Sequence, residues 1–149
     1  MNERYETFTL LISRISRSIR RLHNQEMADY GLRSAHIACL HALCLQNGLT
    51  ATELCERCEE DKATVSRALD FLEENGYLLY KTKSDKHYRS VITLTEKGHA
   101  VGQKISEKIE RVLDEVSTGL TEEERIAFYH SLSIICEHLD HAAKRREEK

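Results

Sequence analysis

Apolar residues near the start of the chain repeat every three or four positions, which is the period of an α-helix. The repeating residues are Tyr5, Phe8, Ile12, Ile15, Ile19 and Leu22. We expect Gly31 to end this run, because glycine is the usual residue just beyond a helix. Ser34 is then the expected N-cap of a second helix, with Ile37 and Leu40 turned inward.

Two short helices are predicted next. Thr50 and Glu53 have the spacing of a capping box, and the helix that they open would bury Leu54. Asp61 would cap the following helix, and Gly76 would end it. In this helix the positions i, i+3, i+4 and i+7 form one apolar face, made of Val65, Ala68, Leu69 and Leu72. The other face is polar and carries Lys62, Thr64, Ser66, Arg67 and Asp70.

After Gly76 the apolar period shortens to about two, which indicates β-strands. The segments "YLLYKTK" and "YRSVITL", joined by the polar turn "SDKH", predict a hairpin. Thr95 would then cap a long helix, and Thr121 with Glu124 would form the capping box of a last helix. That helix has an apolar stripe of Phe128, Leu132, Ile135 and Leu139. The predicted fold class is mainly α with a small β-hairpin.

Two short helices joined by a tight turn and followed by a basic hairpin describe a winged helix-turn-helix. In such a unit the second short helix enters the DNA major groove, where Arg67 is suited to a bidentate contact with guanine. Thr64 and Ser66 would reach bases or phosphates, and Lys62 would hold a phosphate. The hairpin, or wing, adds Lys83, Lys86 and Arg89 to the predicted DNA-binding residues.

Composition limits the protein to a few classes. The 149 residues, 40% of them apolar, suit one domain, and no apolar run is long enough to span a membrane. The first twenty residues do not resemble a secretory signal, so we expect a cytoplasmic protein. The net charge of −3 gives no global sign of nucleic-acid binding. The basic wing is therefore the local positive surface that such a function requires.

The stretch "DKATVSRALDFLEENGYL", the wing "KSDKHYRSVITLTEKG" and the long flanking helices resemble the MarR family of bacterial transcriptional regulators. The wing, with an aspartate before basic residues and a close on "LTEKG", is the most specific part. The resemblance implies that Asp85 and Arg89 are the acidic and basic elements of the wing. His87 stands where an arginine is common, which would make wing binding pH-dependent.

The resemblance also implies a homodimer. Residues 34–95 would be the DNA-binding lobe, and residues 1–31 and 96–149 would form the helical dimerisation region. The long apolar stripes of the terminal helices support this independently, since they need more cover than one small lobe supplies. Two-fold symmetry then predicts a pseudo-palindromic operator of double-stranded DNA, with half-sites about 10 bp apart.

The family further implies an effector site in the crevice between the lobe and the long helices. We expect a repressor that a small anionic or aromatic effector releases from DNA. A transcriptional activator is the alternative within the same class of regulator. The counter-charge for an anion would come from an arginine, and the sequence leaves several candidates open. They are Arg14, Arg17, Arg20, Arg21 and Arg33.

Cysteines and histidines raise the alternative of a metal-responsive or redox-responsive regulator. One C-x-x-C pair, Cys55 and Cys58, falls short of a four-ligand zinc site, and both are better read as small buried hydrophobes. Cys39, Cys44 and Cys136 are further thiols without a clear signal. His36 lies where a zinc-sensing branch of the family has a ligand, but the histidine-rich stretch of that branch is missing. We therefore expect no cofactor and no metal.

Two other classes of protein compete with a DNA-binding regulator. A winged helix can dock a protein partner, so a helical protein-interaction module is the main alternative, although the basic residues of the wing argue against it. The chain shows no nucleophile with a nearby base, no glycine-rich phosphate loop and no paired carboxylates, so we do not expect an enzyme.

Overall fold

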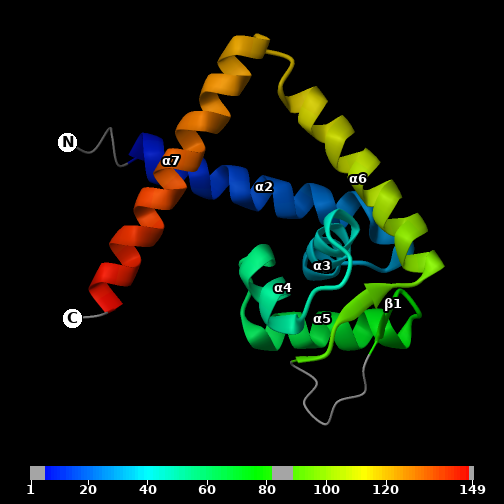
Figure 1. Cartoon of the computed structure of the whole chain (residues 1–149). Helices are drawn as coiled ribbons and strands as arrows, with labels where there is room; N and C mark the ends of the chain where they lie inside the picture. Colours follow the sequence, from blue (N-terminus) through cyan, green and yellow to red (C-terminus); the bar gives the residue numbers. More distant parts are fainter. Residues whose placement is uncertain (1–5, 82–88, 148–149) are drawn as a thin grey trace. The chain divides into compact units, whose positions relative to one another are not determined.

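A computed structural model of the chain describes residues 6–81 and 89–147. The chain forms two compact units, Met1–Ile109 and Glu110–Lys149. Figure 1 shows the helices and strands of the chain. The elements in chain order are the π-helical turn η1 (Glu6–Leu10), α2 (Leu11–Glu26), the 3-10 turn η2 (Ala28–Tyr30), α3 (Ser34–Leu45), α4 (Ala51–Cys58), α5 (Lys62–Glu74), β1 (Leu78–Tyr80), β2 (Ile92–Leu94), α6 (Glu96–Val116) and α7 (Glu122–Glu147). The predicted class, mainly α with a small hairpin, is confirmed.

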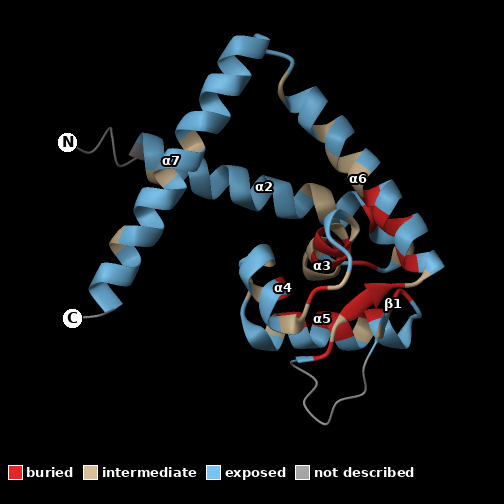
Figure 2. Ribbon diagram, in the orientation of Figure 1, coloured by how far each residue is buried: buried red, intermediate tan, exposed pale blue. Residues whose placement is uncertain are grey.

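The core of the first unit lies among α3, α4, α5, the two strands and the start of α6 (Figure 2). Leu40 and Leu43 of α3 and Leu54 of α4 are fully buried there. The predicted apolar face of α5 is confirmed, since its four residues are all at most 2% exposed: Val65, Ala68, Leu69 and Leu72. Burial of this face turns the polar face of α5 outward.

The hairpin pairs β1 and β2 in antiparallel register, with Leu78 opposite Leu94 and Tyr80 opposite Ile92. The strands are shorter than the predicted segments. A bridge from outside the hairpin extends the sheet, because the Ile92 N–H donates to the Leu49 carbonyl at 2.8 Å. Leu49, in the loop between α3 and α4, thus connects the helix-turn-helix to the wing by a backbone hydrogen bond.

Three predicted helix starts are confirmed by side-chain hydrogen bonds. At α4 the Thr50 N–H donates to the Glu53 carboxylate at 2.7 Å and the Glu53 N–H donates to Thr50 Oγ1 at 3.3 Å, a complete capping box. The same pair of bonds joins Thr121 and Glu124 at the start of α7. At α6 the Gly98 N–H donates to Thr95 Oγ1 at 3.0 Å. Each cap satisfies backbone donors that the first helical turn leaves unpaired.

The end of α5 also follows the prediction. Gly76 has a φ of 74°, a left-handed conformation that favours glycine. Its N–H donates to the Glu73 carbonyl, and the Tyr77 N–H donates to the Leu72 carbonyl at 2.8 Å. These two bonds form a Schellman motif, which ends the helix and directs the chain into β1.

Two predicted boundaries near the start of the chain are wrong. The first helix ends at Glu26, and the separate turn η2 leads to Gly31. Ser34 is the first residue of α3 and not its cap; Arg33 holds the cap position. The reason is tertiary for Ser34, since its N–H is satisfied by Asn24 Oδ1 of α2 at 2.9 Å. The Arg33 N–H is satisfied locally, by His36 Nδ1 at 3.0 Å.

The start of α6 lies directly against the end of the α5 turn. The Thr95 N–H donates to the Tyr77 carbonyl at 3.0 Å, and Thr95 Oγ1 donates to the Gly76 carbonyl at 2.7 Å. Gly98 lies so close that a Cβ there would be 1.9 Å from the Tyr77 carbonyl oxygen. The glycine of "LTEKG" is therefore required by this contact between α6 and Tyr77, the residue before β1.

The second unit consists of the end of α6 and α7. Within its described residues α7 buries no side chain, although it carries large apolar residues (Figure 2). Those more than a third exposed in this unit are Leu113, Val116, Leu120, Ile126, Phe128, Tyr129, Ile134 and Leu139. Across the described part of the chain, no helix combines the length and apolar character needed to cross a membrane.

Candidate nucleic-acid interface

The candidate interface is the polar face of α5, and its first turn is fixed by Asp61. The Thr64 N–H donates to Asp61 Oδ1 at 2.8 Å, and the Thr64 hydroxyl donates to Asp61 Oδ2 at 2.8 Å. These bonds, the backbone one first, hold the pKa of the Asp61 carboxyl below its ordinary value. The cap is therefore ionised at neutral pH, and the helix starts at one defined residue.

Arg67 lies one turn further along α5 and is exposed. Its Nη2 donates to Thr64 Oγ1 at 3.3 Å, so a chain of hydrogen bonds runs from Asp61 through Thr64 to Arg67. Thr64 is half-buried and its hydroxyl is occupied within the helix, which makes it a support for Arg67. Lys62 and Ser66 are exposed beside Arg67, as predicted.

The preceding helix and turn hold α5 in place. α4 ends with Glu59 in the left-handed region at a φ of 51°, and the Glu60 N–H donates to the Cys55 carbonyl at 3.3 Å. The turn between α4 and α5 is therefore short and hydrogen-bonded. Together with the buried Leu54 and Leu69, it gives the compact pair of helices that a helix-turn-helix needs.

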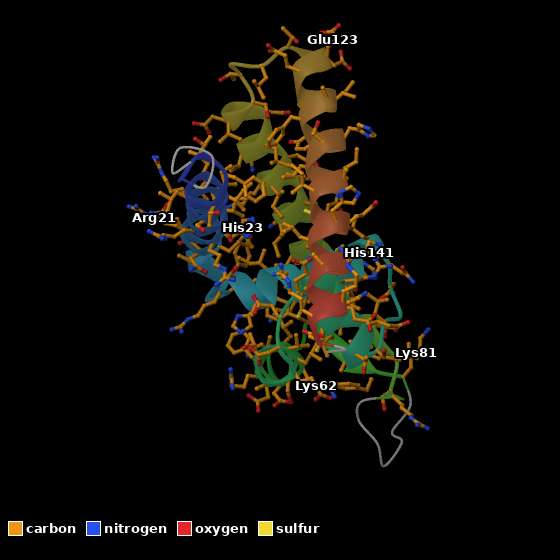
Figure 3. All side chains as sticks on the ribbon, turned by 90° about the vertical axis from the view of Figure 1, so that its left-hand side faces the viewer. Arg21, His23, Lys62, Lys81, Glu123 and His141 are labelled. Atoms are coloured by element: carbon orange, nitrogen blue, oxygen red, sulfur yellow. The ribbon has the colours of Figure 1, made fainter. Side chains whose placement is uncertain are left out.

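The base of the wing is described, and its tip is not. The Lys81 N–H donates to the Val91 carbonyl at 2.9 Å and continues the ladder of β1 and β2. Figure 3 shows Lys62, at the start of α5, and Lys81, at the end of β1, in the lower part of the view. Arg89 is exposed on the other arm. The remaining predicted wing residues lie outside the described residues: Lys83, Asp85, Lys86 and His87.

A cavity of about 350 Å³ opens on the first unit between α2, α3, α4 and α6. Its walls are mainly apolar, and three basic side chains join them. The lining residues are His23, Ile37, Ala38, His41, Ala42, Leu45, Arg57, Cys58 and Ile109. A volume of this size suits a small molecule.

Hydrogen bonds orient the basic residues of the cavity. The Ser106 hydroxyl donates to the Gly102 carbonyl at 3.1 Å, so His41 Nδ1, 3.2 Å from Ser106 Oγ, is the donor in that contact. Burial, and then the neighbouring His41, lower the pKa of His23. Arg57 donates from Nη2 to Gln46 Oε1. The cavity thus combines apolar walls with one guanidinium, that of Arg57, which can donate to an anion.

The sequence predicted other arginines for this role. Arg57, on α4, is the arginine among the described residues that line the cavity, and the arginines predicted from α2 and its flank are not among them. The α2 residue that reaches the cavity is His23. Because the lining comes from four separate helices, no spacing in the sequence signals it.

The other histidine and cysteines considered as metal or redox candidates pack against neighbouring parts of the fold. The His36 ring stacks on Phe71 with centroids 4.3 Å apart, which joins α3 to α5. Cys39 is 1% exposed in the core, while Cys55 and Cys58 are half-buried against it. Among the residues that the structure describes, no group of three or more histidine, cysteine or acidic side chains could hold a metal ion.

Known proteins similar to this chain come from one family. The model of the MarR family matches residues 30–90, from η2 through α5 to the wing. The uncharacterized HTH-type transcriptional regulator YwoH of Bacillus subtilis (strain 168) is 26% identical over 119 residues, which cover 80% of this chain and 86% of that protein. A MarR-family transcriptional regulator from Silicibacter pomeroyi has a similar structure, with a TM-score of 0.74, 29% identity and 84% of each chain covered. The predicted resemblance to the MarR family is confirmed.

A MarR relative solved with nucleic acid shares the fold. The putative MarR family transcriptional regulator from Listeria monocytogenes, complexed with 26mer DNA, matches with a TM-score of 0.82 and 24% identity, covering 89% of this chain and 88% of that one. These similarities confirm the predicted winged helix and the predicted class, a DNA-binding transcriptional regulator and not an enzyme.

Proposed function

We propose that the chain is a homodimeric cytoplasmic repressor that reads a pseudo-palindromic operator with α5 and leaves it when an effector fills the cavity. The observation that carries this proposal is the polar face of α5. Its exposed residues stand on a helix whose start is fixed by Asp61 and whose opposite face is buried. The DNA complex of the Listeria relative, which has the same fold, supports the assignment.

Within this proposal Arg67 reads sequence and its neighbours hold the backbone. Thr64 orients the Arg67 guanidinium, which would donate in bidentate fashion to guanine O6 and N7 in the major groove. Lys62 and Ser66 would contact phosphates or base edges. On the wing, Lys81 and Arg89 flank the tip, and Lys83, Asp85, Lys86 and His87 remain the predicted residues of the tip itself.

The homodimer is supported by exposed apolar side chains in both units. In the first unit Phe8, Ile12, Ile15 and Ile19 on η1 and α2 are all more than a third exposed. The second unit exposes the apolar residues of α7. Apolar faces of this extent are typical of association surfaces. A two-fold dimer would bring two α5 helices to half-sites about 10 bp apart.

The cavity supports release by a small anionic aromatic compound. Its apolar walls would hold the ring, and the remaining N–H groups of the Arg57 guanidinium would bind the anionic group. To displace DNA, the effector must bind the DNA-incompetent arrangement of the dimer more tightly than the competent one. The cavity touches α4, the first helix of the helix-turn-helix, so an effector there is placed to bias that arrangement.

The test is binding of the purified protein to the intergenic duplex beside its gene and to a scrambled duplex, by fluorescence anisotropy at two salt concentrations. We expect tight, salt-dependent binding to the first duplex, at two subunits per site. Arg67→Ala should lose about 1 to 3 kcal/mol on that duplex. Arg67→Lys is the matched control, since it keeps the charge but not the planar fork, and should retain binding to the scrambled duplex.

A phosphate contact behaves differently from a base contact. Lys86→Ala should weaken binding to both duplexes alike and reduce the slope of log affinity against log salt by about one unit. If Arg67→Ala bound each duplex with the same affinity as the unmodified protein, that result would contradict the proposed role of α5. Absence of binding at low salt would favour the protein-interaction module instead.

A further inference from the structure

The outer edge of β2 lies against the loop between α3 and α4, residues 46–50. Successive N–H groups of a strand in an antiparallel pair point to opposite edges. β1 occupies one edge of β2, where the Lys81 N–H donates to the Val91 carbonyl. The N–H groups of Ile92 and Leu94 therefore point away from β1, toward the loop. Without partners on that side, the hairpin would be a two-stranded ribbon with an open edge.

Two oxygen atoms of the loop accept from these donors. The Ile92 N–H donates to the Leu49 carbonyl at 2.8 Å, and the Leu94 N–H donates to Asn47 Oδ1 at 3.1 Å. The first acceptor is backbone and the second is a side chain, so Asn47 supplies the oxygen that a backbone carbonyl would supply in a third strand. Leu94 is 7% exposed, so loss of the Asn47 amide would leave its N–H without a good partner.

We propose that Asn47 is a positioning residue for the wing: its side chain fastens β2 to the helix-turn-helix and so fixes the arms that carry Lys81 and Arg89. Lys81 follows β1 directly, and Arg89 lies three residues before β2 begins. A hairpin of two short strands is marginally stable by itself. A wing that is already fixed loses less conformational entropy when it meets DNA, which raises affinity. This role in DNA binding rests on the proposed function, whereas the fastening of β2 does not.

The polar face of α5 is fixed by other groups, namely the Asp61 cap and the buried apolar face of the helix. Loss of the Asn47 amide should therefore affect the wing and spare the base contacts of Arg67. Contacts with phosphates carry no sequence information, so we expect Asn47→Ala to bind the intergenic and scrambled duplexes about tenfold more weakly, with their affinity ratio unchanged within about twofold. The slope of log affinity against log salt should fall by about one unit, because one fewer phosphate is neutralised.

The experiment measures amide hydrogen exchange of the full-length protein by NMR, and then duplex binding by fluorescence anisotropy at two salt concentrations. In Asn47→Ala the Leu94 amide should exchange about fivefold faster, while the Val65 amide of α5 should keep its rate. Asn47→Asp should restore slow exchange, since its carboxylate also accepts from the Leu94 N–H. Gln103→Ala is the control, because it removes an exposed amide whose hydrogen bond to Glu107 stays within α6. It should change neither the exchange nor the binding.

The outcomes separate the fastening of β2 from its consequence for DNA. Unchanged exchange at Leu94 in Asn47→Ala would overturn the fastening. Equal acceleration at Leu94 and Val65 would show a general loss of stability and would overturn the positioning role. Faster exchange at Leu94 with an unchanged salt slope would overturn the consequence for DNA. If the unmodified protein bound neither duplex, the proposed function would fail, and the exchange of Leu94 alone would decide whether Asn47 fastens β2.

Discussion

Gly98→Ala tests the contact between α6 and the hairpin. The Cβ would lie 1.9 Å from the Tyr77 carbonyl oxygen and 3.0 Å from its carbon, whereas ordinary contacts begin at 3.4 Å. Both partners are backbone, and Tyr77 is further held because its carbonyl accepts from the Thr95 N–H. Neither side can rotate away, so the start of α6 must move as a whole.

The expected cost follows from overpacking. Extra methyl groups in a well-packed core cost about 1 to 3 kcal/mol, and a clash with backbone belongs at the upper end. Alanine would recover up to about 1 kcal/mol as the better helix former. We expect the free energy of unfolding to fall by about 3 kcal/mol, a large share of the roughly 5 to 15 kcal/mol that stabilises a typical domain.

The assay is urea unfolding followed by circular dichroism, at one fixed protomer concentration, because association would raise the apparent stability. Gly102→Ala is a graded comparison, since its Cβ would meet the Cys44 Sγ at 2.2 Å, a side chain that can turn aside. Gly119→Ala is the control, because nothing lies within 4 Å of its Cβ. A loss at Gly98 below about 1 kcal/mol, or no larger than at Gly119, would refute the reasoning.

Three further predictions concern the core, the pH dependence and association. Leu72→Ala, at a fully buried position of α5, should lower the free energy of unfolding by about 2 to 5 kcal/mol in the same urea assay. Burial, and then the charge of Arg33, lower the pKa of His36 from 6.5, so the unfolded chain takes up the proton more readily. The free energy of unfolding should stay constant above about pH 7 and decline as the pH falls below the pKa of the histidine in the unfolded chain. His36→Asn should reduce the decline in urea midpoint between about pH 7.5 and 5.5. Leu139→Lys, at a position 53% exposed on α7, should shift the protein toward monomer in light scattering, whereas an unchanged mass would contradict the proposed dimer surface.

Sequence patterns located the helices correctly where the deciding interaction is local. The caps at Thr50, Asp61 and Thr121 each bond a backbone N–H three residues away, so the spacing of residue types is enough to identify them. The Schellman turn at Gly76 is equally local. The outward face of α5 followed for the same reason, because a period of 3.6 residues fixes which side chains share a face. The polar row of the candidate interface was therefore predictable, including Arg67.

The errors occur where a distant element supplies the partner. Ser34 has the residue type of a cap, yet Asn24 of α2 satisfies its N–H, and the cap position passes to Arg33. The isolated bridge from Leu49 to Ile92 leaves no repeating pattern of apolar residues from which it could be predicted. Nothing in the sequence around Arg57 relates it to a cavity, because the walls come from four helices.

The glycine of the wing motif connects these two cases. "LTEKG" can be recognised as a signature from the sequence, but its physical reason is a distant contact: Gly98 is the position where α6 meets the carbonyl of Tyr77, the residue before β1. The same carbonyl accepts from Thr95, the residue that caps α6. The cap therefore fixes where α6 begins, and Gly98 allows that beginning to lie against the base of the wing. A motif of this kind marks the place where the start of α6 packs against the base of the hairpin.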